Sequence, residues 1–394
     1  APLTLRAVCR SWQAIVDETR RAWSYLEITD TTSPAFCKSW IQHCAHVPYH
    51  LTVHPSVRKA VVEAALEAEE CSPVCLSLFN SLHVLVNNFP NLEVLRLGPA
   101  NRATKLRRNK RFKDEKNRSL YALRHRADAS NSLLTSIRFP KLRALYLNAP
   151  PVCLLKQVAK ASEFPPLLQE LHILIDSEHW RPIVALTAGS LVKLGLRMSN
   201  RHPSLEGDRI DLPRLTDLSL SLRRLDKNRS TLEDHASRNL NFATPTLKNY
   251  REQDSVGMGS FPLYPGISTV KTVHFEGQKP IDWLGFDSLE EVVLTTPAVG
   301  VERQLSPLLE DIAVCPSLCS IKLVLYGEEN MEIPEKERVY TALKALGERR
   351  RVVVEVQLPS PDYTKYHVEA FERFTYCSCN TGDERAQDRF NENQ

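Results

Sequence analysis

The residues in this sequence best suited to chemistry are histidines and cysteines crowded into 18 positions near its start: Cys37, His43, Cys44, His46, His50 and His54. Imidazole and thiolate side chains are zinc ligands, and a structural zinc site needs four of them converging in tetrahedral geometry. Cys37 and Cys44, however, fall on the apolar face of an expected helix, beside Trp40 and Ile41. We therefore interpret this group as core residues and predict no metal site.

Other motifs that carry chemistry are missing from the sequence. Cys377 and Cys379 are spaced too closely for a zinc pair and have no second pair. There is no Gly-x-Ser-x-Gly, His-Glu-x-x-His or kinase signature and no glycine-rich phosphate loop. We expect no catalytic residue and no cofactor. An enzyme with dispersed catalytic residues is one alternative, which a deep pocket with converging titratable groups would support.

Composition narrows the class of protein. The chain has 394 residues, with 51 Lys and Arg against 47 Asp and Glu, a balance that does not favour a nucleic-acid partner. No run of 18 apolar residues and no signal-peptide pattern occurs, and the ten cysteines are scattered. We predict no membrane span and reduced thiols in the cytoplasm or nucleus. The first residue is Ala and lies inside an expected helix, so we expect further residues upstream.

One unit recurs along the chain. Its pattern is Pro-x-Leu-x-x-Leu-x-Leu, clearest at 89–97 and 139–147. The three apolar positions fall at 92/95/97, 142/145/147, 168/171/173, 191/194/196, 215/218/220, 247/250/252, 270/273/275, 289/292/294 and 318/321/323. The copy at 247 is the poorest, because Tyr250 and Glu252 replace two leucines. A period mostly in the twenties with this spacing is typical of leucine-rich repeats, whose strands bury a shared core only when they stack.

Alternation within each strand predicts a surface as well as a core. Leucines of Leu-x-Leu point inward, so the residues between and beside them line the opposite, exposed face of the sheet. Open repeat surfaces of this kind bind partners. We predict that a protein partner binds through Arg96, Tyr146, His172, Arg197, Asp217, Arg251, His274, Glu276 and Lys322. The alternative is a hydrated sheet face, with binding elsewhere on loops or an edge.

Apolar periodicity predicts helices around these strands. We expect them at 3–19, from Ser33-Pro34 to before Pro48, at 57–70, at 76–88, around 152–159, 232–240 and 305–312, and at 334–350. A final buried strand is expected at 352–358. The segment 102–126 holds eleven Lys or Arg and is expected to be an exposed insertion, with a nuclear-import signal or a patch for an acidic partner as the alternative.

The start of the chain resembles an F-box. Val8-Cys9-Arg10 followed by Trp12 and Trp23 matches the second half of that domain, over about the first 28 residues. The repeats resemble the leucine-rich subgroup of F-box proteins, although none of the nine copies carries the usual Asn or Cys three positions after its last leucine. The resemblance implies an α/β fold: an irregular leucine-rich-repeat solenoid, a curved parallel sheet with helices outside, preceded by a small helical F-box remnant.

The same resemblance implies a function. Residues 1–47 would form the F-box remnant and a linking helix, residues 48–358 the solenoid, and residues 359–394 a polar tail. The chain would be the substrate-recognition subunit of a Skp-cullin-F-box ubiquitin ligase. Leu5, Val8, Cys9 and Trp12 would contact the Skp-type adaptor, which holds the cullin, and the repeats would hold an unknown protein substrate. The main alternative is a protein-interaction scaffold without a ubiquitin role.

Overall fold

The structure, a computed structural model, describes residues 7–44, 47–54, 57, 59–66, 73–79, 89–98, 139–148, 164–175, 180–199, 207–223, 240–254, 260–262, 264, 266–298, 300–326 and 333–357. The basic segment 102–126, the expected helices around 152–159 and 232–239, and the tail 359–394 lie outside these residues.

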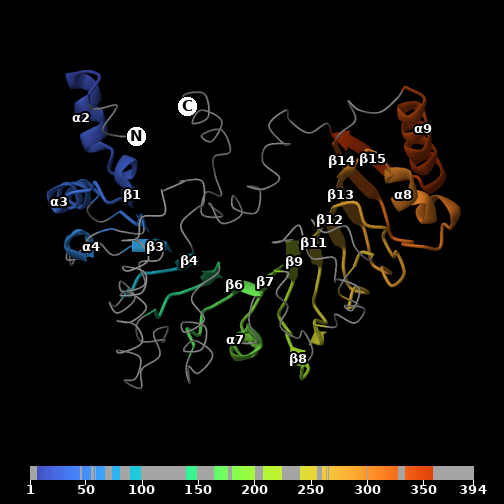
Figure 1. The fold of residues 1–394 in the computed structure, drawn as a ribbon, viewed down its shortest axis with the longest axis horizontal. Coiled ribbons are helices and arrows are strands. Elements are labelled where there is room, and N and C mark those ends of the chain that lie inside the picture. The colour runs from blue at the N-terminus through green and yellow to red at the C-terminus, as the bar shows by residue number, and fades with distance from the viewer. Residues whose placement is uncertain are drawn as a thin grey trace, which may run out of the picture.

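A 13-stranded sheet dominates the fold, and every pairing within it is parallel. Its strands, in spatial order, are β1 (Tyr25–Ile28), β2 (Tyr49–Val53), β3 (Pro73–Phe79), β4 (Val94–Gly98), β5 (Ala144–Leu147), β6 (Glu170–Ile175), β7 (Lys193–Ser199), β9 (Asp217–Arg223), β11 (Asn249–Asp254), β12 (Thr272–Glu276), β13 (Glu291–Pro297), β14 (Ser320–Tyr326) and β15 (Val353–Gln357). Spatial order therefore follows chain order. The strands curve into an arc (Figure 1). The α/β class with a large curved parallel sheet is confirmed.

The repeat unit explains nine of these strands. All three apolar positions of every copy are buried, including the poor copy at 247. In that copy Glu252 is fully buried on β11, and the Tyr250 hydroxyl donates to its Oε2 at 2.6 Å. A hydrogen-bonded carboxylate thus occupies a leucine position without breaking the strand.

The prolines act in a turn that precedes each strand. The Leu92 N–H donates to the Phe89 carbonyl at 3.2 Å, and Leu142 donates to Phe139 in the same way. Pro90 and Pro140 are each the second residue of that turn, where a fixed φ is favoured and no N–H is needed. The sequence had indicated only that proline ends a helix and starts a strand.

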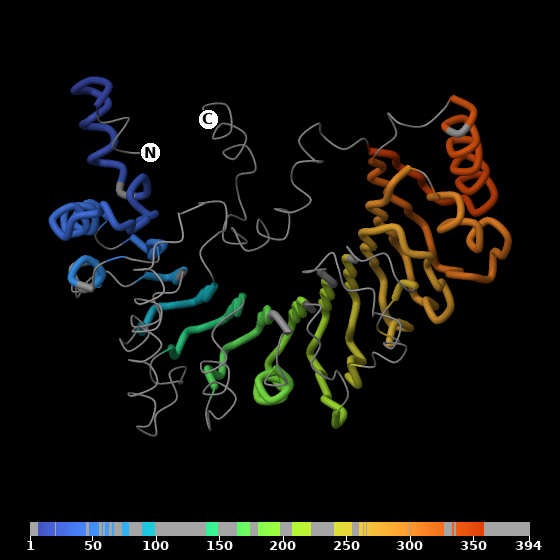
Figure 2. Tube along the Cα trace, viewed as in Figure 1, coloured from blue at the N-terminus to red at the C-terminus, as the bar shows by residue number. Residues whose placement is uncertain are grey.

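Most helices lie along the outer side of the arc, and α2 projects from its N-terminal end (Figures 1 and 2). The helices are α2 (Arg10–Glu18), the 3₁₀ helix η1 (Arg20–Trp23), α3 (Pro34–His43), α4 (Lys59–Leu66), α7 (Trp180–Thr187), α8 (Val301–Glu310) and α9 (Ile333–Arg350). The Ser33 hydroxyl accepts a hydrogen bond from the Phe36 N–H, which confirms the predicted start of α3. A small parallel pair, β8 (Ile210–Asp211) with β10 (Phe242–Ala243), lies outside the main sheet.

Three expected elements are corrected by the structure. The helix expected over 3–19 is not continuous within the described residues: α2 starts at Arg10, because Cys9 is extended, with φ −164° and ψ 169°, and residues 3–6 lie outside the described ranges. Residues 76–79 belong to β3 and not to a helix, since pairing with β2 and β4 outweighs local helical periodicity. The final strand β15 forms at the predicted place but is not buried: Val353 is 59% exposed, because β15 is the edge of the sheet.

A single continuous core runs between the sheet and its outer segments, from Val16 on α2 to Val352 before β15. The strand leucines pack there against apolar side chains of the outer helices, such as Trp180 and Leu305. The polar side chains between those leucines therefore lie on the inner, concave face of the arc. None of the helices in the described ranges is long and apolar enough to cross a membrane.

Candidate partner-binding face

Strand register builds one continuous row of side chains along the concave face. The residues at the middle of each Leu-x-Leu end pair laterally from strand to strand, so side chains far apart in sequence become neighbours. From β4 to β14 this central row reads Arg96, Tyr146, His172, Gly195, Ser219, Arg251, His274, Val293 and Lys322. Six of the nine predicted partner-binding residues lie within this row. The other three, Arg197, Asp217 and Glu276, each lie two residues from a member of the row on the same strand.

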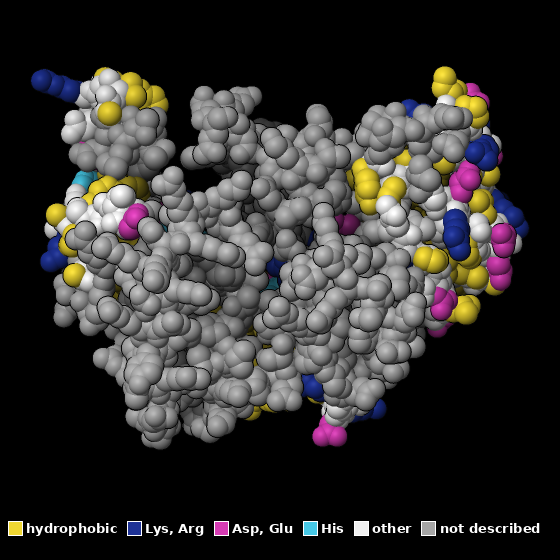
Figure 3. Space-filling model, in the orientation of Figure 1, with side chains coloured by type: hydrophobic (Ala, Val, Ile, Leu, Met, Phe, Trp, Pro, Cys, Tyr) yellow, Lys and Arg dark blue, Asp and Glu magenta, His cyan; other side chains and the backbone are white. Residues whose placement is uncertain are grey.

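The middle of this row is hollow because its two central residues are small. Gly195 on β7 pairs with Ser219 on β9. Between and around them lies a cavity of about 330 Å³, which we call the central hollow. Its lining includes six predicted residues, Tyr146, His172, Arg197, Asp217, Arg251 and His274. A group of Lys or Arg and His side chains is visible at the centre of the molecule in Figure 3.

One wall of the central hollow is a stacked pair of rings. Tyr146 and His172 lie nearly parallel, with centroids 4.7 Å apart and 9° between their planes. Both reach Glu170 Oε1: the Tyr146 hydroxyl donates at 2.7 Å, and His172 Nε2 lies at 3.0 Å. Burial alone would raise the pKa of Glu170, but these hydrogen bonds and nearby positive charge lower it to about 2. Glu170 is therefore ionised and holds both rings in place.

The opposite wall carries a guanidinium group. Arg251 Nη2 lies 3.3 Å from Glu276 Oε2, and Gln253 donates to Glu276 Oε1 at 2.8 Å. His274, beside Arg251, contacts the Thr295 hydroxyl at 3.2 Å. Burial first, and then the positive charge of Arg251, lower the pKa of His274 to about 4. His274 is thus neutral at physiological pH.

Charged residues at the first positions of three strands line one edge of the central hollow. Glu170, Lys193 and Asp217 are register neighbours on β6, β7 and β9. Asp217 Oδ1 accepts from Asn249 at 2.8 Å, and its Oδ2 accepts from the Thr216 hydroxyl at 2.6 Å. Lys193 is exposed, and its ammonium makes no hydrogen bond or ion pair with another residue in the described part of the chain.

Three predicted residues lie outside the lining of the hollow. The Arg96 guanidinium lies over the Tyr146 ring, 5.1 Å from its centroid. Glu276 contacts Arg251 as described. Lys322 lies further along the face on β14, where it pairs with Glu291 on β13 at 2.6 Å. The structure thus places eight of the predicted residues in one connected area and Lys322 apart from it; their role in binding stays a prediction.

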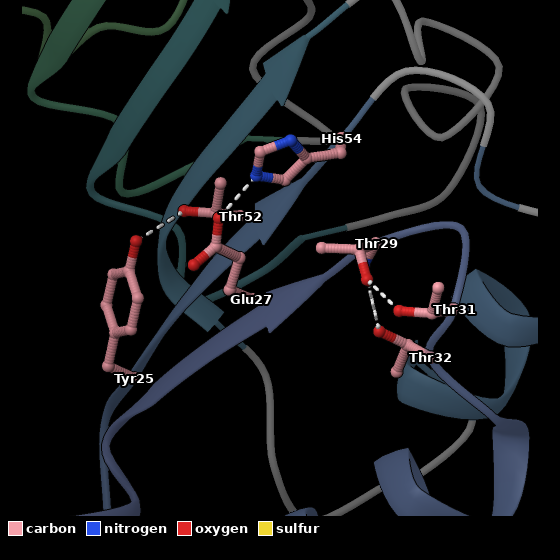
Figure 4. A network of polar contacts seen from close by, with 7 residues as sticks. All are labelled: Tyr25, Glu27, Thr29, Thr31, Thr32, Thr52 and His54. Carbon is pink, nitrogen blue, oxygen red and sulfur yellow. Dashed lines mark hydrogen bonds and ion pairs between the residues drawn. The ribbon is translucent and has the colours of Figure 1, made fainter. Parts of the chain in front are cut away.

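The first two strands extend the polar face toward the N-terminal end of the arc (Figure 4). Tyr25 on β1 and Thr52 on β2 share a hydrogen bond of 3.3 Å between their hydroxyls. Glu27 contacts His54 Nε2, and the Thr29 hydroxyl lies 2.9 Å from that of Thr31. The first two contacts join β1 to β2 and to the residue after it, and the third lies within the loop that follows β1.

The predicted adaptor contacts lie at the N-terminal end of the arc. Val8 and Trp12 are 63% and 45% exposed, and Ile15 on the same side of α2 is 54% exposed. Cys9 is exposed as well, as the residue that precedes α2, while Leu5 lies outside the described residues. Trp12 and Ile15, three residues apart, lie on one face of α2, whereas Val8 lies in the turn before it.

The histidines and cysteines considered for zinc are dispersed. Cys37 and Cys44 are fully buried in the core, where burial raises the pKa of the Cys37 thiol to about 11. The His43 ring stacks on Trp23 at 4.4 Å, and His54 contacts Glu27. No group of three or more His, Cys, Asp or Glu within the described ranges is arranged to hold a metal. His46, Cys377 and Cys379 fall outside those ranges.

Sequence reasoning missed the central hollow itself. Its signal was present in Leu194-Gly195-Leu196 and Leu218-Ser219-Leu220, two consecutive repeats with a small middle residue. Gly195 and Ser219 are small and adjacent on the exposed face, so they leave open space. In other repeats a larger middle residue, such as Tyr146 or Arg251, takes up the corresponding position. Asn249 and Gln253 were also not among the predicted contacts. They donate hydrogen bonds to the carboxylates of Asp217 and Glu276, respectively.

Comparison with known proteins adds no further assignment. The chain matches no protein-family model, and no curated protein matches it. The functional argument therefore rests on the geometry described above.

Proposed function

We propose that this chain is a substrate-recognition subunit of a Skp-cullin-F-box ubiquitin ligase, built as an F-box remnant followed by leucine-rich repeats. The observation that supports this most directly is the concave face, where eight predicted residues from seven strands surround or adjoin one hollow. Stacked repeats expose such a face for binding a protein partner.

Exposed apolar side chains on α2 and in the turn before it support the second part of the proposal. Val8, Trp12 and Ile15 present apolar surface to solvent at the end of the arc remote from α9 (Figure 1). A clustered apolar face on a charged helix is a feature of protein interfaces. In the proposed complex the Skp-type adaptor covers this face.

The proposal assigns no chemical step to the chain. In the central hollow Glu170 is ionised and His274 is neutral across the physiological range, so neither exchanges a proton near pH 7. The chain would act by holding a substrate lysine close to a ubiquitin-charged partner enzyme, which raises effective concentration.

Co-purification tests the proposal. The tagged full-length protein is expected to retain a Skp-type adaptor and a cullin, and Trp12→Arg combined with Ile15→Arg is expected to abolish this retention. Leu284→Arg is the matched control, because Leu284 is 74% exposed on the loop after β12, far from α2 in the chain. Failure of the wild-type protein to retain the adaptor would leave the scaffold alternative.

A further inference from the structure

Planar side chains form a ladder along the first part of the central row. The Arg96 guanidinium lies 5.1 Å from the centroid of the Tyr146 ring, and that ring stacks on His172 with centroids 4.7 Å apart. The three groups come from β4, β5 and β6, which pair in that order, and neighbouring strands lie about 4.8 Å apart. Each of these strands therefore supplies one planar group to a continuous stack.

The ladder is interrupted at the next two strands. Gly195 on β7 has no side chain, and the His172 ring leans over it into the space that a Cβ atom would take. Ser219 on β9 carries only a hydroxymethyl group. Planar groups resume with Arg251 on β11 and His274 on β12. The central hollow is thus the space of a missing ring beside Ser219.

The His172 ring has a face open to this space. Tyr146 covers the opposite face, and the His172 side chain is 25% exposed. Apart from Tyr146, Glu170 and the approach to Gly195, this side chain makes no hydrogen bond, ion pair or ring contact with another described residue. A cavity of about 150 Å³ is enough for benzene. The hollow, at about 330 Å³, has room for one aromatic side chain.

The charged side chains around the hollow favour neither an anion nor a cation. The lining holds three Lys or Arg and two carboxylates, and a third carboxylate, Glu276, pairs with Arg251 at 3.3 Å beside it. Three positive charges are therefore balanced by three negative ones. An ion that entered would lose its hydration without gaining a net opposite charge, whereas a neutral ring carries no such cost.

We propose that the central hollow receives one aromatic side chain of the protein partner, Phe, Tyr or Trp, which stacks on His172 as the missing rung of the ladder. Stacked aromatic pairs add attraction beyond the area they bury, and aromatic side chains in central pockets dominate the energetics of many interfaces. Arg197 and Arg251 keep their present contacts and are not ligands. This site deepens the proposed function and rests on its assumption that the concave face binds a protein.

Capped amino acids test the site directly. The probes are the N-acetyl amides of Phe, Trp, cyclohexylalanine, Glu and Arg, together with free indole. Titrations followed by saturation-transfer NMR on the purified full chain give the dissociation constants. The Phe amide is expected to bind about three- to tenfold more tightly than the cyclohexylalanine amide, which is similar in size but has no π face. The Glu and Arg amides are expected to bind more weakly than either.

Three variants localise the effect. His172→Leu keeps an apolar side chain without a planar face, so it is expected to remove the preference for Phe over cyclohexylalanine, whereas His172→Phe is expected to retain it. Ser219→Trp supplies the missing ring from the chain itself and is expected to abolish binding of both amides. Lys322→Gln is the matched control, since Lys322 lies on the same face but outside the lining. Thermal unfolding confirms that each variant is folded.

Several outcomes would overturn the proposed site: no binding of the Phe and Trp amides, equal binding of the cyclohexylalanine amide, tighter binding of the Glu or Arg amide, or a preference that His172→Leu and Ser219→Trp leave unchanged. Binding of indole without binding of the Trp amide would also overturn it, in favour of a free small molecule. These titrations need no adaptor. Retention of the adaptor without an aromatic preference would therefore refute this site alone, whereas an aromatic preference without the adaptor would refute only the ligase role.

Discussion

At the scale of single residues, the contact between Gly195 and His172 shapes the binding face. A Cβ atom built on Gly195 would lie 2.1 Å from His172 Nδ1 and 2.7 Å from its Cε1. The histidine ring thus lies directly over the glycine. This close approach lets the ring stack on Tyr146 while it contacts Glu170.

Gly195→Ala should therefore displace the His172 ring and destabilise the protein by about 1–3 kcal/mol, the usual cost of overpacking. Chemical denaturation measures this free energy. In the His172→Ala background the same substitution should cost much less, because the clashing ring is gone. Gly189→Ala is the control, since no heavy atom lies within 4 Å of its added Cβ. Equal costs of Gly195→Ala in both backgrounds would contradict the explanation.

Two groups of the concave face predict how stability depends on pH. The folded-state pKa of His274 is lowered to about 4, and that of Glu170 to about 2. Each lowered value means that the unfolded chain binds protons more readily, so stability falls as pH falls. His274 contributes this loss between about pH 6.5 and 4, and Glu170 between about pH 4.5 and 2.

Urea unfolding across this range measures both windows. His274→Gln should flatten the slope in the upper window, and Glu170→Gln should flatten it in the lower one, each by up to about 3 kcal/mol in total. If either variant altered the opposite window instead, the assignment of the two groups would be incorrect.

At the scale of elements, Arg350 joins the last two helices. It ends α9, and its guanidinium donates to four carbonyls at and after the end of α8: Leu308 (2.6 Å), Asp311 (2.7 Å), Cys315 (3.3 Å) and Val314. A planar group with five donors suits carbonyls that a helix end leaves without intrahelical partners. This arrangement fixes α9 against the segment that leads into β14.

Replacing this guanidinium tests the interpretation. Arg350→Lys keeps the charge but loses the fork of donors, and it should destabilise the protein by about 1–3 kcal/mol in thermal or chemical unfolding. Arg349→Lys is the matched control, because Arg349 is exposed and donates only to the Glu310 carbonyl among the described residues, at 3.2 Å. A similar loss in both variants would mean that charge at the helix end, and not the donor geometry, stabilises the contact.

At the scale of the whole molecule, each strand of the main sheet pairs only with its nearest neighbours along the chain. No described strand closes the sheet by returning to β1, and β15 is an exposed edge. Stability in such an array is a sum of local units and nearest-neighbour interfaces rather than one global transition.

Hydrogen exchange should therefore vary along the arc. Backbone amides of β15 are expected to exchange faster than those of β7, β9 and β11, which are paired on both sides and pack on the core. Mass spectrometry after native-state labelling measures this gradient. A single exchange rate across all the strands would show that the sheet opens as one cooperative unit, contrary to the prediction.

Much of the fold and of the polar face could be predicted from the sequence. Three features follow from local rules. They are the burial of the repeat positions, the placement of Arg96 and Tyr146 on the face opposite the core, and the start of α3 after Ser33. The failure came where distant pairing decides, since residues 76–79 have helical periodicity but form β3.

The sequence by itself determined where each repeat strand lies and which side chains leave its buried face, because alternation and proline turns act within about ten residues. Only the tertiary structure decided which side chains meet across strands. Gly195 and Ser219 are 24 residues apart and become neighbours through lateral register alone, as do Glu170, Lys193 and Asp217. Register depends on how whole repeats stack, so the central hollow and its charge balance are properties of the assembled sheet.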